Sequence, residues 1–408
     1  MEASEIGVTP DKITVEVMAD TGSQAIPGMA NGSVEAVQAW AKLVNSQGGL
    51  ACRQVEVKTY DSKIDPNESR NGYTQGCQSA FAMVGTFALS VADTTPLTDC
   101  ADKAGAKTGL PETAAVAVSS VHACGPTTYT TFGNGQPCPP PSGARDIVVT
   151  TAVGDYMKGV LGNDAHGVYS IANTSPATIQ PVMGPIRYMQ NTQGLKADLE
   201  IGAKGTDTQD HYTPAGTTIR DKKSNFVFNT ATFPSFLLLK KEAKAQGDDS
   251  VKIWMCQATC YDPAFIKAGG ADAVGTQVSI NTVPYEEADS VPELKTFVDN
   301  VQTHNTFSST SWLASRMFEQ AVNDVVAKDG PNGLTRAKLL AALKDMKDFT
   351  ANGMIGATTP SAHEPPKCIV IVEAQADGFK RVFPTEPGTL SCKDTGTINL
   401  DPTTAFKG

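Results

Sequence analysis

Apolar residues recur at two different spacings along most of this chain. Residues 13–18 and 82–85 carry the apolar runs of buried strands, whereas residues 31–46 place Val34 and Val37 at helical spacing. A strand followed by a helix is then repeated, and this order predicts a parallel sheet with helices on both faces. In the first third of the chain we predict strands at residues 13–18, 55–60 and 82–85 and helices at residues 31–46, 66–81 and 94–104.

The repeat is interrupted once and then resumes. Residues 113–143 are rich in Pro, Gly, Thr and Ser, which predicts a crossover with an insertion, and a second crossover is expected near residues 281–289. Between and after them we predict helices at residues 146–161, 177–193, 212–222, 234–246, 292–302, 308–327 and 334–346 and strands at residues 166–171, 196–201, 225–229, 251–255, 274–280, 368–373 and 379–383.

This pattern predicts an α/β protein with two Rossmann-like lobes, each containing a parallel-type sheet. A chain of 408 residues is also too long for one ordinary core. We expect one lobe to comprise residues 1–122 and 285–350, and the other to comprise residues 123–284 and 351–408.

Composition excludes several partners. The net charge is -10 and no run is rich in Lys or Arg, so a nucleic-acid partner is not expected. The same balance argues against docking of the protein body on anionic lipid. No segment approaches the roughly 18–20 apolar residues that span a bilayer. Residues 1–4 are typical of a start added to a mature chain, so we expect that a signal peptide has been removed.

Nine cysteines indicate an oxidising compartment. None lies in a CxxC motif or in a zinc-type spacing with histidine, so no metal site is predicted. They form pairs that are local in sequence, and we expect four disulfides with Cys100 left over. The expected pairs are Cys52 with Cys77, Cys124 with Cys138, Cys256 with Cys260, and Cys368 with Cys392. The alternative is a cytosolic protein with nine thiols.

Loops that follow the strands hold the candidate binding residues, because ligands of open parallel sheets bind beyond the carboxyl ends of the strands. These loops are small and polar, and hydroxyls and N–H groups at helix starts suit a carboxylate or another acceptor-bearing ligand. The alternative for any one of them is a helix cap. The candidates are Ser23, Gln24, Phe87, Leu89, Ser90, Glu112 and Thr113 in the first lobe and Asn173, Thr174, Thr230, Phe233, Gln257 and Thr259 in the second.

Catalytic motifs are missing from the sequence. GxSxG, HExxH, GxGxxG and Walker-type loops do not occur, and the five histidines are scattered. We therefore predict neither an enzyme nor a cofactor. A secreted hydrolase is the alternative, because a Ser/His/Asp site assembles from distant positions.

Several short motifs, taken in order, resemble one known family. The motifs are Thr21-Gly22, the segment at residues 45–50, Tyr60-Asp61 before Asp65-Pro66, Val84-Gly85 and the late Gly378. The chain resembles the type I periplasmic solute-binding proteins of the leucine/isoleucine/valine-binding group, the receptors of branched-chain-type ABC importers.

The resemblance implies two lobes joined by three crossover strands, with a small-molecule ligand held between them. It also implies a membrane permease as partner, a monomer, and a location in the periplasm or at the cell surface, with or without a lipid anchor. In this family the first lobe holds the ligand carboxylate, and the loops at Leu89-Ser90 and Glu112-Thr113 occupy those places here. A ligand-sensing receptor ectodomain of the same fold is a further alternative.

This chain departs from the family pattern in the second lobe. The loop expected to carry an acidic residue contains Gln257 and Thr259 between two cysteines, and Thr174 stands where many members have tyrosine. A buried ammonium group without a carboxylate partner is costly. We therefore expect an apolar or aromatic carboxylate or a neutral molecule, with Phe87 and Phe233 as packing surface, and not a simple α-amino acid.

Overall fold

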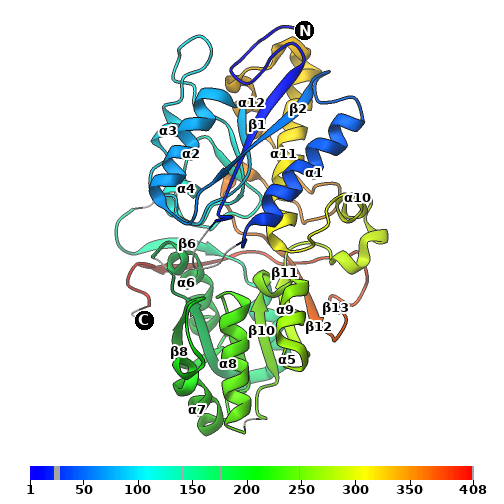
Figure 1. Ribbon diagram of the computed structural model, residues 1–408. Helices are drawn as coiled ribbons and strands as arrows, with labels where there is room; N and C mark the ends of the chain where they lie inside the picture. Colours follow the sequence, from blue (N-terminus) through cyan, green and yellow to red (C-terminus); the bar gives the residue numbers. More distant parts are fainter. Residues whose placement is uncertain (23–27, 140, 175, 248, 407–408) are drawn as a thin grey trace. The chain divides into compact units, whose positions relative to one another are not determined.

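Two α/β units make up the chain. The computed structural model describes residues 1–22, 28–139, 141–174, 176–247 and 249–406. Unit 1 comprises Met1–Pro140, Lys295–Gly353 and Ala357–Glu364, and unit 2 comprises Pro141–Leu294, Met354–Gly356 and Pro365–Gly408 (Figure 1). Each is an α/β unit with a parallel-type sheet, so the predicted fold class is confirmed. The sequence-based boundaries after residues 122, 284 and 350 stay a prediction.

Unit 1 contains a five-stranded sheet in the order β2-β1-β3-β4-β5, with every pair parallel. Helices α1 and α11 cover one face and α2 covers the other (Figure 1). The strands are β1 (Lys12–Ala19), β2 (Gln54–Asp61), β3 (Ala82–Phe87), β4 (Glu112–Val116) and β5 (Thr128–Thr130). The helices are α1 (Asn31–Ser46), α2 (Pro66–Ser79), α3 (Thr95–Thr98), α4 (Ser120–Ala123), α11 (Thr306–Asp329) and α12 (Arg336–Asp345), and α10 (Pro292–Asn300) begins in unit 2 and ends in unit 1.

Gly85 explains how closely α1 and α11 approach β3. Its φ is 74°, a left-handed conformation that favours glycine. A Cβ atom at this position would lie 2.4 Å from the Val37 side chain on α1, and the Ser311 hydroxyl on α11 donates to the Gly85 carbonyl at 3.0 Å. Any side chain here would push both helices away from the sheet.

Unit 2 contains an eight-stranded sheet. Its path is β13-β12-β11-β10-β9-β7-β8, with β14 paired to β12, and β15 pairs with β6 in a separate two-stranded sheet. The pairs from β8 to β11 are parallel, whereas β12 and β13 are antiparallel to their neighbours. The strands are β6 (Arg145–Val149), β7 (His166–Ala172), β8 (Lys196–Ala203), β9 (Phe226–Asn229), β10 (Ile253–Gln257), β11 (Thr276–Ile280), β12 (Cys368–Ala374), β13 (Phe379–Phe383), β14 (Ser391–Cys392) and β15 (Gly396–Leu400). The helices are α5 (Ala152–Leu161), α6 (Pro176–Asn191), α7 (Thr213–Lys222), α8 (Phe233–Ala245) and α9 (Pro263–Gly269).

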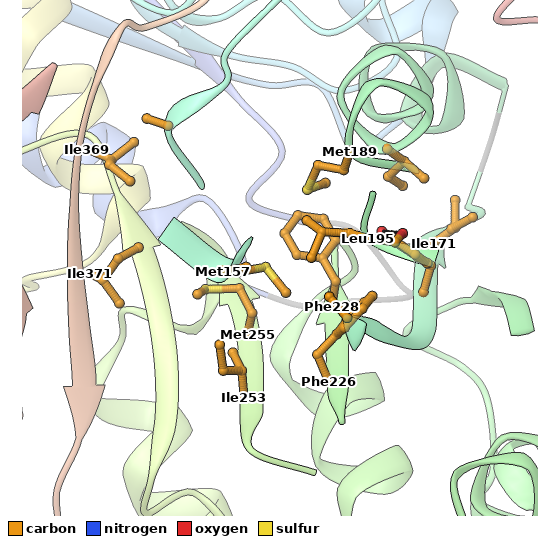
Figure 2. Packing of buried hydrophobic residues seen from close by; sticks show 14 of the residues in the cluster. Met157, Ile171, Met189, Leu195, Phe226, Phe228, Ile253, Met255, Ile369 and Ile371 are labelled. Atoms are coloured by element: carbon orange, nitrogen blue, oxygen red, sulfur yellow. Dashed lines mark hydrogen bonds between the residues drawn. The ribbon is translucent and has the colours of Figure 1, made fainter. Parts of the chain in front are cut away.

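Every second residue of the central strands enters one core of unit 2. Figure 2 shows side chains from β7, β9, β10 and β12 in one cluster with methionines of α5 and α6. Because side chains alternate across a strand, the residues between them point to the opposite face. Phe228 and Met255 therefore enter this core, whereas Asn229 and Cys256 face the other side.

Two predicted helices are wrong in extent. The helix expected at residues 94–104 is only α3 (Thr95–Thr98), because the Asp102 carboxylate accepts from the N–H groups of Ala104 and Ala106 and closes a turn instead. The helix expected from residue 146 begins at Ala152, and the β-branched residues before it form β6 and pair with β15.

Candidate functional site

Asp20 organises the carboxyl edge of the unit 1 sheet. It follows β1 directly and its side chain is fully buried. One oxygen accepts from the N–H of Leu89 at 2.8 Å, and the other accepts from the Ser62 hydroxyl at 2.7 Å and the Ile64 N–H at 2.6 Å. Burial raises the pKa of Asp20, and these hydrogen bonds oppose that effect. The loops after β2 and β3 are therefore fixed to the end of β1.

Asp61, the last residue of β2, holds the loop that follows β1 at the same edge. Its Oδ1 atom accepts from the backbone N–H groups of Thr21, Gly22 and Lys63, at 3.1, 2.9 and 3.1 Å. This carboxylate at the end of β2 therefore already has backbone partners. Ser23 and Gln24, which we predicted as binding residues, lie outside the described residues.

An aromatic pair gives this edge an apolar surface. Phe87, the last residue of β3, contacts Phe307 in an edge-to-face arrangement with ring centroids 4.9 Å apart. They belong to a cluster that also includes Ala19, Met29, Ala30, Val34, Leu89, Ala115 and Val116. Ser90, a predicted binding residue, follows Leu89 and is half-buried.

The sequence analysis missed Phe307. It lies in the first turn of α11, where Asn305 and Ser308 form a capping box. That box marks a helix start in the sequence. Nothing local shows that this start returns to the end of β3, because the two segments are about 220 residues apart in sequence.

Glu112 and Thr113 lie in a strand and not in a loop, so their predicted position is wrong, while their role in binding stays a prediction. Glu112 begins β4, at the amino edge of the sheet, and is fully buried. Its carboxylate accepts from Tyr73 at 3.1 Å and Thr128 at 2.8 Å, and His122 Nε2 lies 2.9 Å away. Burial raises the pKa of Glu112, but His122 and Thr128 more than offset it, so its pKa lies below the usual value. Thr113 is buried within β4 as well.

The predicted residues of unit 2 follow three neighbouring strands. Asn173 and Thr174 follow β7, Thr230 follows β9, and Gln257 ends β10 with Thr259 after it. Thr230 Oγ1 accepts from the N–H of Ala172 at 2.9 Å, which joins the ends of β7 and β9. The structure therefore brings this part of the predicted site together at one edge. Phe233 begins α8 and contacts the Phe265 ring of α9, with centroids 6.0 Å apart.

Buried uncharged oxygens lie near the ends of β7 and β9. Ser170 Oγ, Asn229 Oδ1 and Thr232 Oγ1 are buried atoms without a hydrogen-bond partner among the described residues. Glu286, the first acidic residue after β11, already accepts from the Tyr261 hydroxyl and the Phe379 N–H. Three short segments follow the ends of β7, β9 and β10 directly. They are residues 173–175, 230–232 and 258–260, and their sequences contain no Asp or Glu. An unpaired buried oxygen is a place for a ligand or a water molecule to donate.

Three of the four predicted disulfides are present, and one is wrong. Cys124–Cys138, Cys256–Cys260 and Cys368–Cys392 are bonded, whereas Cys77 pairs with Cys100, with Cα atoms 5.6 Å apart. Cys52 is an exposed free thiol.

The physical reason for this error is the position of Arg336. Its buried guanidinium lies beside the Cys77–Cys100 bond and donates to the carbonyls of Cys77, Ala80 and Ala101. These hydrogen bonds draw the end of α2 toward the turn that contains Cys100. Separation in sequence does not distinguish the two pairings, because Cys77 is 25 residues from Cys52 and 23 residues from Cys100.

One cluster contains the residue types of a hydrolase triad without its geometry. His166 Nδ1 lies 2.7 Å from Asp198 Oδ2, and the Ser224 hydroxyl donates to that same oxygen at 2.6 Å. Serine and histidine therefore both bind the carboxylate, whereas a triad requires serine to bind histidine. Within the described residues, no group of three or more His, Cys, Asp or Glu side chains is arranged to hold a metal ion. In the same part of the chain, no helix is long and apolar enough to cross a membrane.

Two α/β units with polar loops at the carboxyl ends of their strands define a type I periplasmic-binding-protein fold. Residues 17–379 match the model of a family described as periplasmic binding protein, and the chain belongs to that family. The resemblance predicted from the sequence is confirmed. A search of curated protein sequences finds no match.

Solved structures of similar fold carry related descriptions. A solute-binding protein of an ABC transporter from R. palustris, in complex with benzoate, is 19% identical with a TM-score of 0.67, over 94% of this chain and 98% of that one. A fatty acid ABC transporter substrate-binding protein from Thermomonospora curvata is 16% identical with a TM-score of 0.68, over 94% and 97%. A leucine binding protein from Thermotoga maritima is 14% identical with a TM-score of 0.66, over 91% and 97%. At these identities the likeness concerns the fold.

Proposed function

We propose that this protein is the extracytoplasmic solute-binding component of an ABC importer. It captures a small organic ligand without transforming it and delivers it to a membrane permease. Membership of the periplasmic binding protein family supports this proposal, as do similar folds described as substrate-binding proteins of ABC transporters. Four disulfides support a location outside the cytoplasm, because disulfides persist in oxidising compartments.

We further propose that the ligand is an apolar or aromatic carboxylate or a neutral molecule, and not a simple α-amino acid. One observation carries this proposal: no Asp or Glu directly follows β7, β9 or β10 before α6, before α8 or within η3. The carboxylates of Asp20, Asp61, Asp207, Asp262 and Glu286 already accept hydrogen bonds. An ammonium group bound there would lack a negative partner, which is costly in a desolvated site.

The apolar part of the ligand has a surface in unit 1. Phe87 and Phe307 present ring edges and faces within the cluster that contains Leu89 and Val116. Aromatic side chains in binding sites bury large areas and favour ring-shaped or chain-like apolar groups. The descriptions of two similar folds, one with benzoate and one named for fatty acids, agree with this ligand class.

Matched pairs of ligands test the proposal directly. Thermal unfolding is measured with phenylalanine against 3-phenylpropanoate and with leucine against 4-methylpentanoate, since each pair differs only in the ammonium group. A ligand present at 100 times its Kd stabilises the folded state by about 2.7 kcal/mol. We expect this stabilisation from at least one acid and none from its amino-acid partner. Tighter binding of phenylalanine or leucine than of the matching acid would overturn the proposed ligand class.

A substitution locates the binding surface. Phe307→Ala is expected to raise the Kd for 3-phenylpropanoate about tenfold or more, because a buried aromatic contact is lost. Val160→Ala is the control, since Val160 is 54% exposed near the end of α5, the helix that leads to the amino end of β7 in unit 2. Equal affinity of the Phe307→Ala variant and the parent protein would exclude Phe307 from the site.

The closing of two lobes on the ligand stays a prediction from the sequence. Small-angle scattering of the protein with and without a bound acid tests it, since closure reduces the radius of gyration. An unchanged radius of gyration with saturating ligand would refute closure.

A further inference from the structure

The loop that follows β10 is closed by its own disulfide. Cys256 is the residue before the end of β10, and Cys260 ends the short 3-10 helix Ala258–Cys260 (η3). The bond spans a sequence separation of 4, so Gln257, Ala258 and Thr259 lie inside a very small covalent ring. Because the stabilisation of a whole fold by a disulfide grows with loop length, a ring of this size acts mainly on the few residues inside it.

Hydrogen bonds join this ring to the loop that follows β9. The Thr259 hydroxyl donates to the carbonyl of Ala231 at 3.0 Å, and the Asn229 side-chain amide donates to the same carbonyl at 2.8 Å. The same amide lies 3.4 Å from Cys256 Sγ. Two neighbouring loops are therefore held as one block by the disulfide, Asn229 and Thr259.

The disulfide is buried, whereas the side chains that it holds in place are partly exposed. Both cysteines are fully buried, whereas Gln257 and Thr259 are partly exposed at the carboxyl edge of the sheet. A buried disulfide is poorly accessible to thiols in solution, so this bond acts as a permanent constraint and not as a surface redox switch. The residues that it holds are those that we assign to ligand contact.

We propose that the Cys256–Cys260 disulfide is a positioning element of the ligand site, which fixes Gln257 and Thr259 in their binding geometry before the ligand arrives. This inference rests on the proposed function. A loop that is ordered before binding loses less conformational entropy when the ligand binds. Ordering one or two side chains costs about 1.4 kcal/mol, which corresponds to about a tenfold change in Kd at 25 °C. The neighbouring polar atoms, Asn229 Oδ1 among them, are held in the same block.

The experiment compares three double variants with the parent protein. Cys256→Ser with Cys260→Ser removes the ring. Cys124→Ser with Cys138→Ser in unit 1 and Cys368→Ser with Cys392→Ser in unit 2 are matched controls that remove a disulfide elsewhere. Thr259→Val is a second test variant, because it removes the hydrogen bond to Ala231 while keeping the disulfide.

Two readouts are made at a temperature where each variant is folded. Hydrogen exchange is measured on peptides that cover residues 257–261, and the Kd for 3-phenylpropanoate is measured by calorimetry together with the binding stoichiometry. We expect faster exchange of this segment and an approximately tenfold higher Kd when the ring is removed, with unchanged stoichiometry. Thr259→Val is expected to speed exchange of this segment to a smaller extent than removal of the ring, and both control pairs are expected to keep the parent Kd.

The outcomes separate the two proposals. Exchange at the parent rate in the ring variant, or faster exchange with a Kd within twofold of the parent, would overturn the positioning role and leave the proposed function intact. An equal rise of the Kd in a control pair would also overturn it, since the effect would then be general. If the parent binds neither 3-phenylpropanoate nor 4-methylpentanoate, the proposed ligand class fails, and exchange of residues 257–261 at the parent rate in the ring variant would still overturn the positioning role.

Discussion

Glu16 lies in the middle of the unit 1 sheet and carries a carboxyl group that the fold does not satisfy. It occupies β1 opposite Lys58 of β2 and Met83 of β3, and its side chain is fully buried. Oε2 accepts a 3.3 Å hydrogen bond from Gln75, while Oε1 has no partner among the described residues. Burial raises the pKa of Glu16 from 4.5 to about 7, and the Gln75 hydrogen bond and the Lys58 charge only partly oppose this.

The sign of the pH dependence follows from this raised pKa. The folded protein holds the Glu16 proton more tightly than the unfolded chain does, so the stabilising effect is complete below about pH 4.5 and is lost as the pH rises through about 7. The difference between the two pKa values is about 2.5, which corresponds to about 3 kcal/mol of lost stability at pH 8. Glu16→Gln keeps the shape and removes the charge. We therefore expect this variant to exceed the parent in stability by up to about 3 kcal/mol at pH 8 and to match it near pH 4.

Urea unfolding at a series of pH values measures this difference. Trp40 and Trp312 are buried in unit 1, so in a Trp254→Phe background, which removes the tryptophan of unit 2, the fluorescence reports on the unit that contains Glu16. Glu2→Gln is the matched control, because Glu2 is exposed in the same unit and undergoes the same change of charge. A difference between the Glu16→Gln variant and the parent that is the same at pH 4 and pH 8 would refute the reasoning.

Three further predictions concern unit 1. Alkylation of the oxidised protein should modify one thiol per chain, at Cys52, and modification at a second cysteine would contradict the assigned bonds. Arg336→Met should lower the free energy of unfolding by about 3–5 kcal/mol in urea titrations, since three backbone carbonyls lose a buried charged donor; a loss below 1 kcal/mol would contradict this role. Asp20→Asn should cost about 1.5–3 kcal/mol and speed hydrogen exchange at the Leu89 amide, and an unchanged exchange rate there would show that Asp20 does not hold this loop.

The spacing of apolar residues predicted most of the helices and strands of the fold. The helix expected at residues 31–46 and the strand expected at residues 379–383 have those bounds in the structure, because each presents a clear spacing of apolar residues and ends at a turn signal. Strands that depend on a distant partner were missed. β6 is stabilised by pairing with β15, about 250 residues away, and without that partner its three β-branched residues are only a short strand signal beside a helix start.

The sequence predicted the positions of candidate site residues only where it also predicted the end of the strand before them. Residues after β7, β9 and β10 lie at one edge, as the parallel order of the strands requires. The predicted loop position of Glu112 is wrong, because the buried partners that hold it in β4 come from α2, α4 and β5, which are separate segments of the sequence. Phe307 and the Cys77–Cys100 bond depend on the packing of distant segments, which no local pattern encodes.

At the carboxyl edge of the unit 1 sheet, the residues that fix the path of the backbone differ from those whose side chains form the surface. Asp20 and Asp61 hold main-chain N–H groups, and these bonds form whatever side chain stands at Leu89. The Leu89 side chain is partly exposed, so it can change without disturbing the path of the chain, whereas Phe87 is 8% exposed and packs in a buried cluster. A library that randomises Leu89 and keeps Phe87 and both aspartates should therefore retain the fold in most members. Under the proposed function, such a library changes the preferred ligand while the backbone that presents it stays the same.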